Sequence, residues 1–100
     1  MDAPVREIER LRRVILELHR CDSSHLRSVA VHEALDGETV WQGTVEVFAL
    51  KGHPKASLAY AWSDPAPDGG RSYVAVLGVP PIRSAADAVR AVIAAGGNAE

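Results

Sequence analysis

One segment, Trp41 to Leu50, limits the folds open to this chain more than any other. Its sequence, WQGTVEVFAL, alternates like a strand but carries apolar side chains on both faces, with Val45 and Val47 on one and Phe48 on the other. A strand that is apolar on one face needs one covering layer. We therefore expect a sheet that helices cover on one side and that has a further apolar surface on the other.

The remaining sequence predicts three more strands and two helices. The apolar positions of the first helix are Ile8, Leu11, Val14, Ile15 and Leu18. The period then changes to two over 26–50, 57–63 and 71–79, and a short helix with a small apolar face follows Ser84. Short links favour a meander. The sequence predicts an α+β fold of order α-β-β-β-β-α, a four-stranded antiparallel sheet with both helices packed on one face.

The first two strands are joined at Asp36-Gly37, a common hairpin signal. A two-residue loop would place Val31 on the face opposite Trp41. A three-residue loop starting at Leu35 pairs Val31 with Trp41, and Gly37 then takes the left-handed position of a bulged turn. We expect the three-residue loop, because it keeps the large apolar groups together.

The third strand alternates by size rather than by polarity, and its orientation stays open. If Ala59 and Ala61 face the helices, then Tyr60 and Trp62 join Phe48 on the outer face. Such a patch is typical of an interface, most commonly with a second copy of the chain. If the large residues face the helices instead, they belong to the core. The candidate interface residues are Phe48, Tyr60 and Trp62.

Size and charge favour a single cytoplasmic domain. The 100 residues predict one domain with flexible ends near 1–3 and 96–100. No apolar run is long enough to cross a bilayer, and the charged start lacks a signal-peptide core. The single cysteine fits a reducing compartment, and the net charge of −2 gives no general attraction for nucleic acid or anionic lipid.

A small-ligand or enzymatic site is one alternative function, built on His53 and Glu46. His53 lies between Gly52 and Pro54 and could act as a general base. A structural turn explains the same residues better. No catalytic partner has a recognisable spacing to His53, and no glycine-rich phosphate loop is present. We therefore expect no catalytic residue and no cofactor.

A nucleic-acid-binding module is the other alternative. The cations that would contact phosphates are Arg6, Arg10, Arg13, Arg20, Lys51 and Lys55. The order of helix, antiparallel strands and helix is similar to double-stranded RNA-binding domains. Those domains typically have three strands and a basic cluster at the final helix, which here begins Ser84-Ala85-Ala86-Asp87. The likeness is topological, and a solvated helix face is the better explanation of the arginines.

A metal site at the end of the first helix is not expected. His19, Cys21, Asp22 and His25 are metal-ligating types. His19 and Cys21, however, are two residues apart and point to different sides of a helix. No second ligand pair follows at a zinc-finger spacing.

The segment WxGxVEVFxLxGHPxA, followed by YAW over 60–62, resembles a family of small uncharacterised bacterial proteins. The resemblance covers about the middle quarter of the chain. It implies a bacterial origin and a compact αβ domain, and it assigns no activity and no site residue. The leading expectation is a non-catalytic domain that self-associates or binds a protein partner through its sheet.

Overall fold

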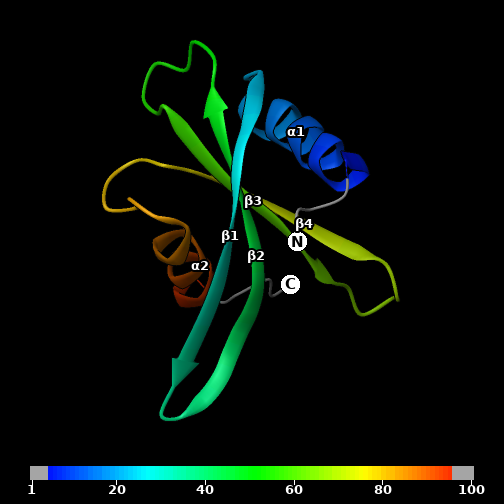
Figure 1. The fold of residues 1–100 in the computed structure, drawn as a ribbon, viewed down its shortest axis with the longest axis vertical. Coiled ribbons are helices and arrows are strands. Elements are labelled where there is room, and N and C mark those ends of the chain that lie inside the picture. The colour runs from blue at the N-terminus through cyan, green and yellow to red at the C-terminus, as the bar shows by residue number, and fades with distance from the viewer. Residues whose placement is uncertain (1–4, 96–100) are drawn as a thin grey trace.

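The computed structural model describes residues 5–95 (Figure 1). The elements are α1 (Val5–His19), β1 (Ser23–Leu35), β2 (Glu38–Leu50), β3 (Leu58–Pro65), β4 (Arg71–Leu77) and α2 (Ala85–Ala94). The four strands form one antiparallel sheet in the order β1-β2-β3-β4. The predicted class, element order and meander are confirmed. The ends predicted to be flexible, 1–3 and 96–100, lie outside the described residues.

The turn between β1 and β2 is shorter than predicted. Leu35 pairs with Glu38, so the loop contains only Asp36 and Gly37. Their φ angles are 54° and 83°, in the left-handed region that both central residues of a two-residue hairpin turn adopt. The predicted three-residue loop is therefore wrong.

A β-bulge inside β2, and not the turn, brings the apolar side chains of β1 and β2 onto the same face. Ala34 pairs with Thr39 but Glu33 pairs with Trp41, so Val40 is the extra residue. From this bulge as far as the pair of Arg27 and Val47, odd-numbered residues of β1 and β2 share a face. Val31 and Trp41 therefore belong to one hydrophobic cluster, as the sequence predicted, although by a different device.

The sheet opens between β2 and β3. Strand β2 pairs with β1 along its whole length but with β3 only from Glu46 to Ala49. Strand β3 continues its pairing with β4 as far as Pro65. Beyond the pair formed by Glu46 and Ala61, β2 and β3 therefore have separate neighbours and diverge.

The large side chains of β3 face α2. Tyr60 and Trp62 are buried beside Val47, and the residues of α2 that meet them are small, chiefly Ala88 and Val89. Of the two orientations that the sequence left open, this is the one that buries the aromatic rings.

The alanines of β3 face α1. Ala59 and Ala61 are buried with Phe48 against Leu11 and Ile15 of α1. Helices α1 and α2 therefore lie on opposite faces of the sheet, and the prediction that both cover one face is wrong (Figure 1). The physical reason is that each apolar face of the sheet receives one helix, so the second helix is the additional covering layer that β2 requires.

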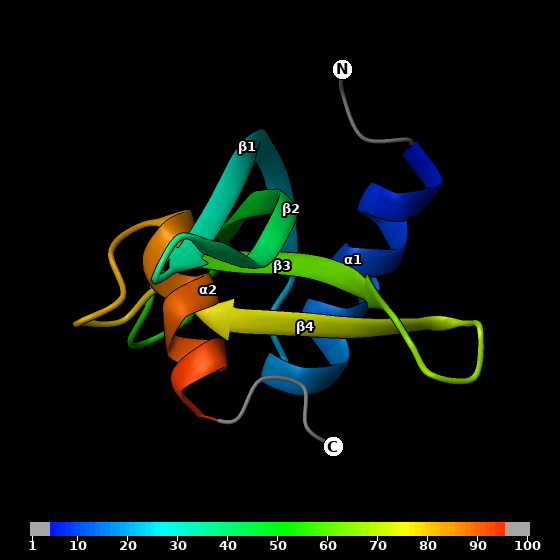
Figure 2. The same cartoon turned by 90° about the horizontal axis from the view of Figure 1, so that it is seen from below.

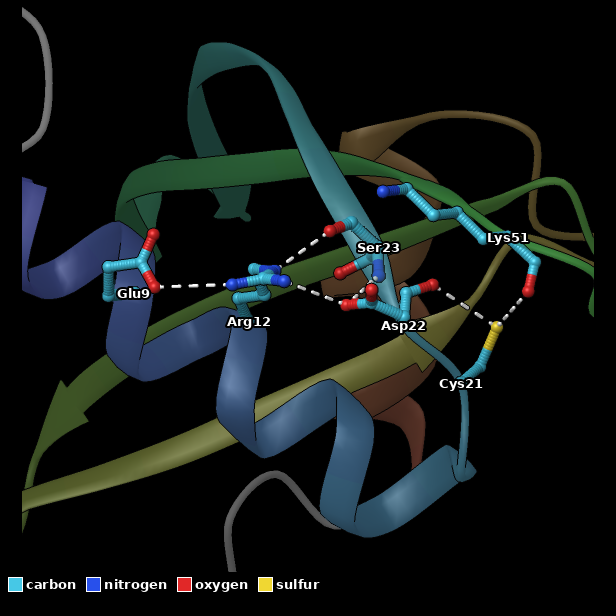
Figure 3. Close-up of polar contacts among 6 residues, drawn as sticks. All are labelled: Glu9, Arg12, Cys21, Asp22, Ser23 and Lys51. Atoms are coloured by element: carbon cyan, nitrogen blue, oxygen red, sulfur yellow. Dashed lines mark hydrogen bonds and ion pairs between the residues drawn. The ribbon is translucent and has the colours of Figure 1, made fainter.

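Polar contacts attach the middle of α1 to the start of β1 (Figure 3). The Arg12 guanidinium donates to the backbone oxygen of Ser23 at 2.9 Å and to the carboxylate of Asp22 at 3.0 Å. Arg12 also pairs with Glu9 at 3.3 Å. These contacts fix the chain reversal between the helix and the first strand.

The second helix begins as predicted. The Ser84 hydroxyl accepts a hydrogen bond from the Asp87 backbone N–H at 3.1 Å, which satisfies one free donor of the first turn. The described helices, of 15 and 10 residues, lack the combination of length and apolar character that a membrane-spanning helix needs.

Candidate functional site

A cleft of about 540 Å³ lies where β2 and β3 diverge, beside the N-terminal half of α1. The volume is within the usual range of small-molecule sites, roughly 300–1,000 Å³. Its lining residues come from α1 and from all three strands β2, β3 and β4. They are Glu7, Arg10, Leu11, Trp41, Gln42, Gly43, Thr44, Glu46, Trp62, Ser63, Asp64, Pro65, Arg71 and Tyr73.

The backbone of β2 offers hydrogen-bonding groups to this cleft. The Leu50 N–H donates to the backbone oxygen of Ser57, just before β3. Because backbone groups point to alternate sides along a strand, the even-numbered residues of β2 direct theirs toward β3 and away from β1. Gln42 and Thr44 follow the same alternation but have no strand beside them on that side. Their N–H and C=O groups therefore face the opening between the strands.

Two tryptophans share one carboxylate across the opening. Trp41 Nε1 donates to Asp64 Oδ1 at 2.9 Å, and Trp62 Nε1 donates to Asp64 Oδ2 at 3.2 Å. The indole rings meet edge to face with centroids 5.7 Å apart. A Cβ on Gly43 would lie 3.0 Å from the Trp41 ring, so the glycine lets that ring lie along its own strand. These contacts form a rigid aromatic wall.

Two arginines flank the mouth of the cleft. Each donates hydrogen bonds to one member of the cross-strand pair formed by Ser63 and Tyr73. Arg10 donates to the Tyr73 hydroxyl at 3.0 Å, and its guanidinium carbon lies 6.0 Å from the ring centroid. This hydrogen bond raises the pKa of Arg10, which stays protonated. Arg71 donates to the Ser63 hydroxyl at 2.8 Å and to its backbone oxygen at 3.1 Å.

The carboxylates that line the cleft already have donors. Ser63 donates its hydroxyl proton to Glu7 at 2.7 Å. Glu46, only 2% exposed, has its Oε1 in contact with His25 Nε2 at 2.8 Å and with the Ser28 hydroxyl at 2.5 Å. His25 also packs edge to face on Phe48. Glu46 is thus buried and Glu7 is half-buried, whereas Arg10 and Arg71 are exposed.

Of the two residues predicted for a ligand site, the structure places one in this cleft. Glu46 lines it, but its histidine partner is His25 rather than His53. His53 lies in the β2–β3 loop, where its Nδ1 accepts backbone N–H groups from Lys55 and Ala56 at 3.0 and 3.1 Å. His53 does not line the cleft with Glu46, and the structural turn is the arrangement observed.

The predicted interface patch is not formed. Phe48, Tyr60 and Trp62 are all buried, and Phe48 lies on the opposite face from the other two. The reason is that the two helices lie on opposite faces, and each covers the aromatic side chains on its own face.

The cations of the nucleic-acid hypothesis do not form one group. Arg6 and Arg13 are exposed on α1, and Arg20 is exposed directly after it. Arg10 belongs to the cleft, and Lys51 and Lys55 lie in the β2–β3 loop. Lys51 donates its backbone N–H to Asp22, whose carboxylate also approaches Arg12. The hypothesis stays a prediction, and loss of duplex RNA binding in Arg10→Glu with Arg13→Glu at low salt would test it.

The metal-ligating side chains near the end of α1 have other partners. His19 Nε2 lies 3.0 Å from the backbone oxygen of Ala75 and therefore donates to it. The buried Cys21 thiol lies 3.2 Å from the Lys51 oxygen. Within residues 5–95, no three His, Cys, Asp or Glu side chains are grouped as a metal site would require.

Comparisons with protein-family models, with curated proteins and with solved structures give no match. The resemblance to small bacterial proteins stays a prediction. Sequence analysis missed most of the cleft because its members, such as Asp64 and Ser63, are ordinary surface types in the sequence. The one available signal was length, since the predicted second strand exceeds the third.

Proposed function

We propose that this domain binds a small organic anion in the cleft between α1 and the diverging strands. The observation that carries the proposal is the pair of guanidinium groups on the rim. Arg10 and Arg71 both reach the Ser63–Tyr73 pair, and each is held by neutral oxygens alone. A guanidinium in this state retains its preference for a carboxylate or phosphate.

The contrast with other arginines supports this choice. Arg12 is paired with Glu9 and Asp22, and Arg90 is paired with Glu33 and Asp87. Among the described residues, seven arginines form no ion pair, and of these only Arg10 and Arg71 line the cleft. Arg10 and Arg71 are exposed, whereas the lining carboxylates are buried or half-buried, so an incoming anion would meet the arginines first.

The remaining surface of the cleft suits the body of such a ligand. The Trp41 ring gives an apolar wall, and the outward backbone groups of Gln42 and Thr44 can bind an amide or hydroxyl. The ligand class is therefore a compact molecule with one anionic group, a flat or apolar body and one further polar group. The proposal assigns binding and no reaction.

Calorimetric titration with benzoate, phenyl phosphate and neutral benzamide tests this proposal. We expect the anions to bind at low salt and benzamide to bind at least about tenfold more weakly, because charge-assisted hydrogen bonds contribute roughly 1.5–3 kcal/mol. Phenyl phosphate against benzoate decides which anionic group is preferred.

Variants locate the binding. Arg10→Ala and Arg71→Ala should each weaken anion binding about tenfold, whereas Arg13→Ala, on the exposed side of the same helix, should not. Amide resonances of Gln42 to Thr44 should shift on titration. Equal binding of benzamide and benzoate, or an equal loss in Arg13→Ala, would show that the proposal is wrong.

A further inference from the structure

The two edges of the sheet are open to different degrees. At the β4 edge, His19 donates to the Ala75 oxygen, and the Val79 N–H donates to the Leu77 oxygen. These contacts occupy acceptors that an added strand would need. Strand β1 forms the other edge, 13 residues long, and no described element lies beyond it (Figure 2).

The hydrogen-bonding groups along β1 can be assigned by alternation. Val29 pairs with Val45, whose backbone groups point toward β1. The backbone groups of Ser28, Ala30 and His32 therefore point outward, away from β2. In the described part of the chain these three residues have no backbone partner on that side.

We propose that a second copy of this chain pairs with the β1 edge, β1 against β1 in antiparallel order about a two-fold axis at Ala30. The outward groups of Ala30 then bond to those of Ala30 in the second copy, and Ser28 bonds to His32 of that copy. About six backbone hydrogen bonds form, and the two sheets join into one continuous sheet.

Charge fixes this register among the symmetric alternatives. With the axis at Ala30, Arg27 of each copy lies opposite Glu33 of the other, and Val29 lies opposite Val31. Moving the axis to Val29 or Val31 places Arg27 opposite an apolar residue. Glu33 also holds Arg90 at 2.9 Å, so each carboxylate would join two guanidiniums. Opposite charges facing each other across two strands stabilise the pairing.

The same register covers exposed leucines. Leu26, the extra residue of a second β-bulge, is 49% exposed, and Leu35 is 66% exposed. In the dimer, Leu26 of one copy approaches Ala34 and Leu35 of the other, at both ends of the paired segment. An isolated edge strand of this length with exposed apolar side chains is otherwise a site of uncontrolled association.

Sedimentation equilibrium with hydrogen exchange tests the proposal. We expect a monomer–dimer equilibrium whose dissociation constant rises with salt, because two charge pairs contribute to it. In the dimer, the amides of Ser28, Ala30 and His32 should become protected, whereas those of Val29 and Val31 are protected in both states. A strict monomer at about 500 µM, or a dimer without new protection at these three amides, would overturn the proposal.

Arg27→Glu tests the register, since it places like charges opposite each other twice. Its dissociation constant should rise about tenfold or more, while Arg13→Glu, with the same change of charge on α1, should leave it unchanged. Adding Glu33→Gln to Arg27→Glu should recover most of the lost affinity. A dimer that tolerates Arg27→Glu, or one that the second change does not rescue, would show that a different register or surface is used.

Discussion

The two faces of the sheet are packed in opposite ways. Toward α2, large strand side chains such as Trp62 and Tyr60 meet small helix residues such as Ala88. Toward α1, small strand residues such as Ala61 meet large helix residues such as Leu11. In each layer one partner supplies the volume and the other allows close approach.

This difference shows what the alternation in β3 means. A strand that alternates between large and small apolar residues is buried on both faces, and each face selects a helix of complementary size. The α1 face also carries the buried carboxylate of Glu46 with its partner His25, and the cleft lies at its margin. The larger buried cluster lies under α2, and the α1 face borders the cleft.

The largest effect is expected for Trp62→Ala on the α2 face. Trp62 is 2% exposed, and its removal leaves a cavity and takes one donor from Asp64. We expect a loss of about 3–5 kcal/mol in the free energy of unfolding, measured by urea denaturation. A loss below about 1 kcal/mol would mean that α2 repacks readily and that the two faces are less distinct than described.

Replacing a small residue of either layer with a larger one should lower the free energy of unfolding by less than Trp62→Ala does. Ala61→Leu on the strand side of the α1 layer, and Ala88→Leu on the helix side of the α2 layer, should each destabilise by about 1–3 kcal/mol through overpacking. Ala94→Leu, at an exposed position of α2, is the matched control and should change stability little. Tolerance of Ala61→Leu would contradict the proposed exchange of sizes between the layers.

The polar attachment of α1 should contribute a smaller amount. Arg12→Met keeps the aliphatic stem and removes the hydrogen bonds to Ser23 and Asp22. We expect a loss of about 1–2 kcal/mol in thermal or urea unfolding. Arg13→Met, one residue further along the exposed side of α1, should have almost no effect. Equal effects in the two variants would show that apolar contacts alone hold α1 on the sheet.

The smallest effect concerns acid stability. The Ser23 N–H, with help from Arg12, holds the pKa of Asp22 below its ordinary value of 3.8. The charged carboxylate therefore favours the folded state above that value, and the contribution is lost as pH falls through the lower folded value. Unfolding curves between about pH 5 and pH 2 should show a smaller decrease in stability for Asp22→Asn than for the wild type. An identical decrease would assign the acid sensitivity to other carboxylates.

The sequence predicted the local features of this fold better than the long-range ones. Element order followed from periodicity, and the Ser84 cap from its residue type, because both depend on neighbours in the chain. The bulge at Val40 was missed because a longer turn or a bulge would each bring the apolar side chains of the two strands onto one face. The predicted placement of the helices was wrong because the alternation of large and small residues in β3 was taken to mean one covered face, whereas both of its faces are covered.

The cleft was the hardest part to predict. It exists because β2 continues past the end of its pairing with β3, which depends on strand lengths that periodicity fixes poorly. Glu46 does line the cleft, but its contact with His25 depends on the strand register. His53 was a plausible ligand by type, yet the turn that it forms uses its ring nitrogen for backbone N–H groups.

The shared carboxylate of Trp41 and Trp62 has an optical consequence. These are the chain's two tryptophans, so all of its indole absorption and emission arises from one pair of rings in edge-to-face contact. Electronic transitions at that separation couple and give the near-ultraviolet circular dichroism of the protein a signature of their relative orientation. The protein thus carries its own chromophore at the opening between β2 and β3, and a change in the angle between those strands can be followed without a label.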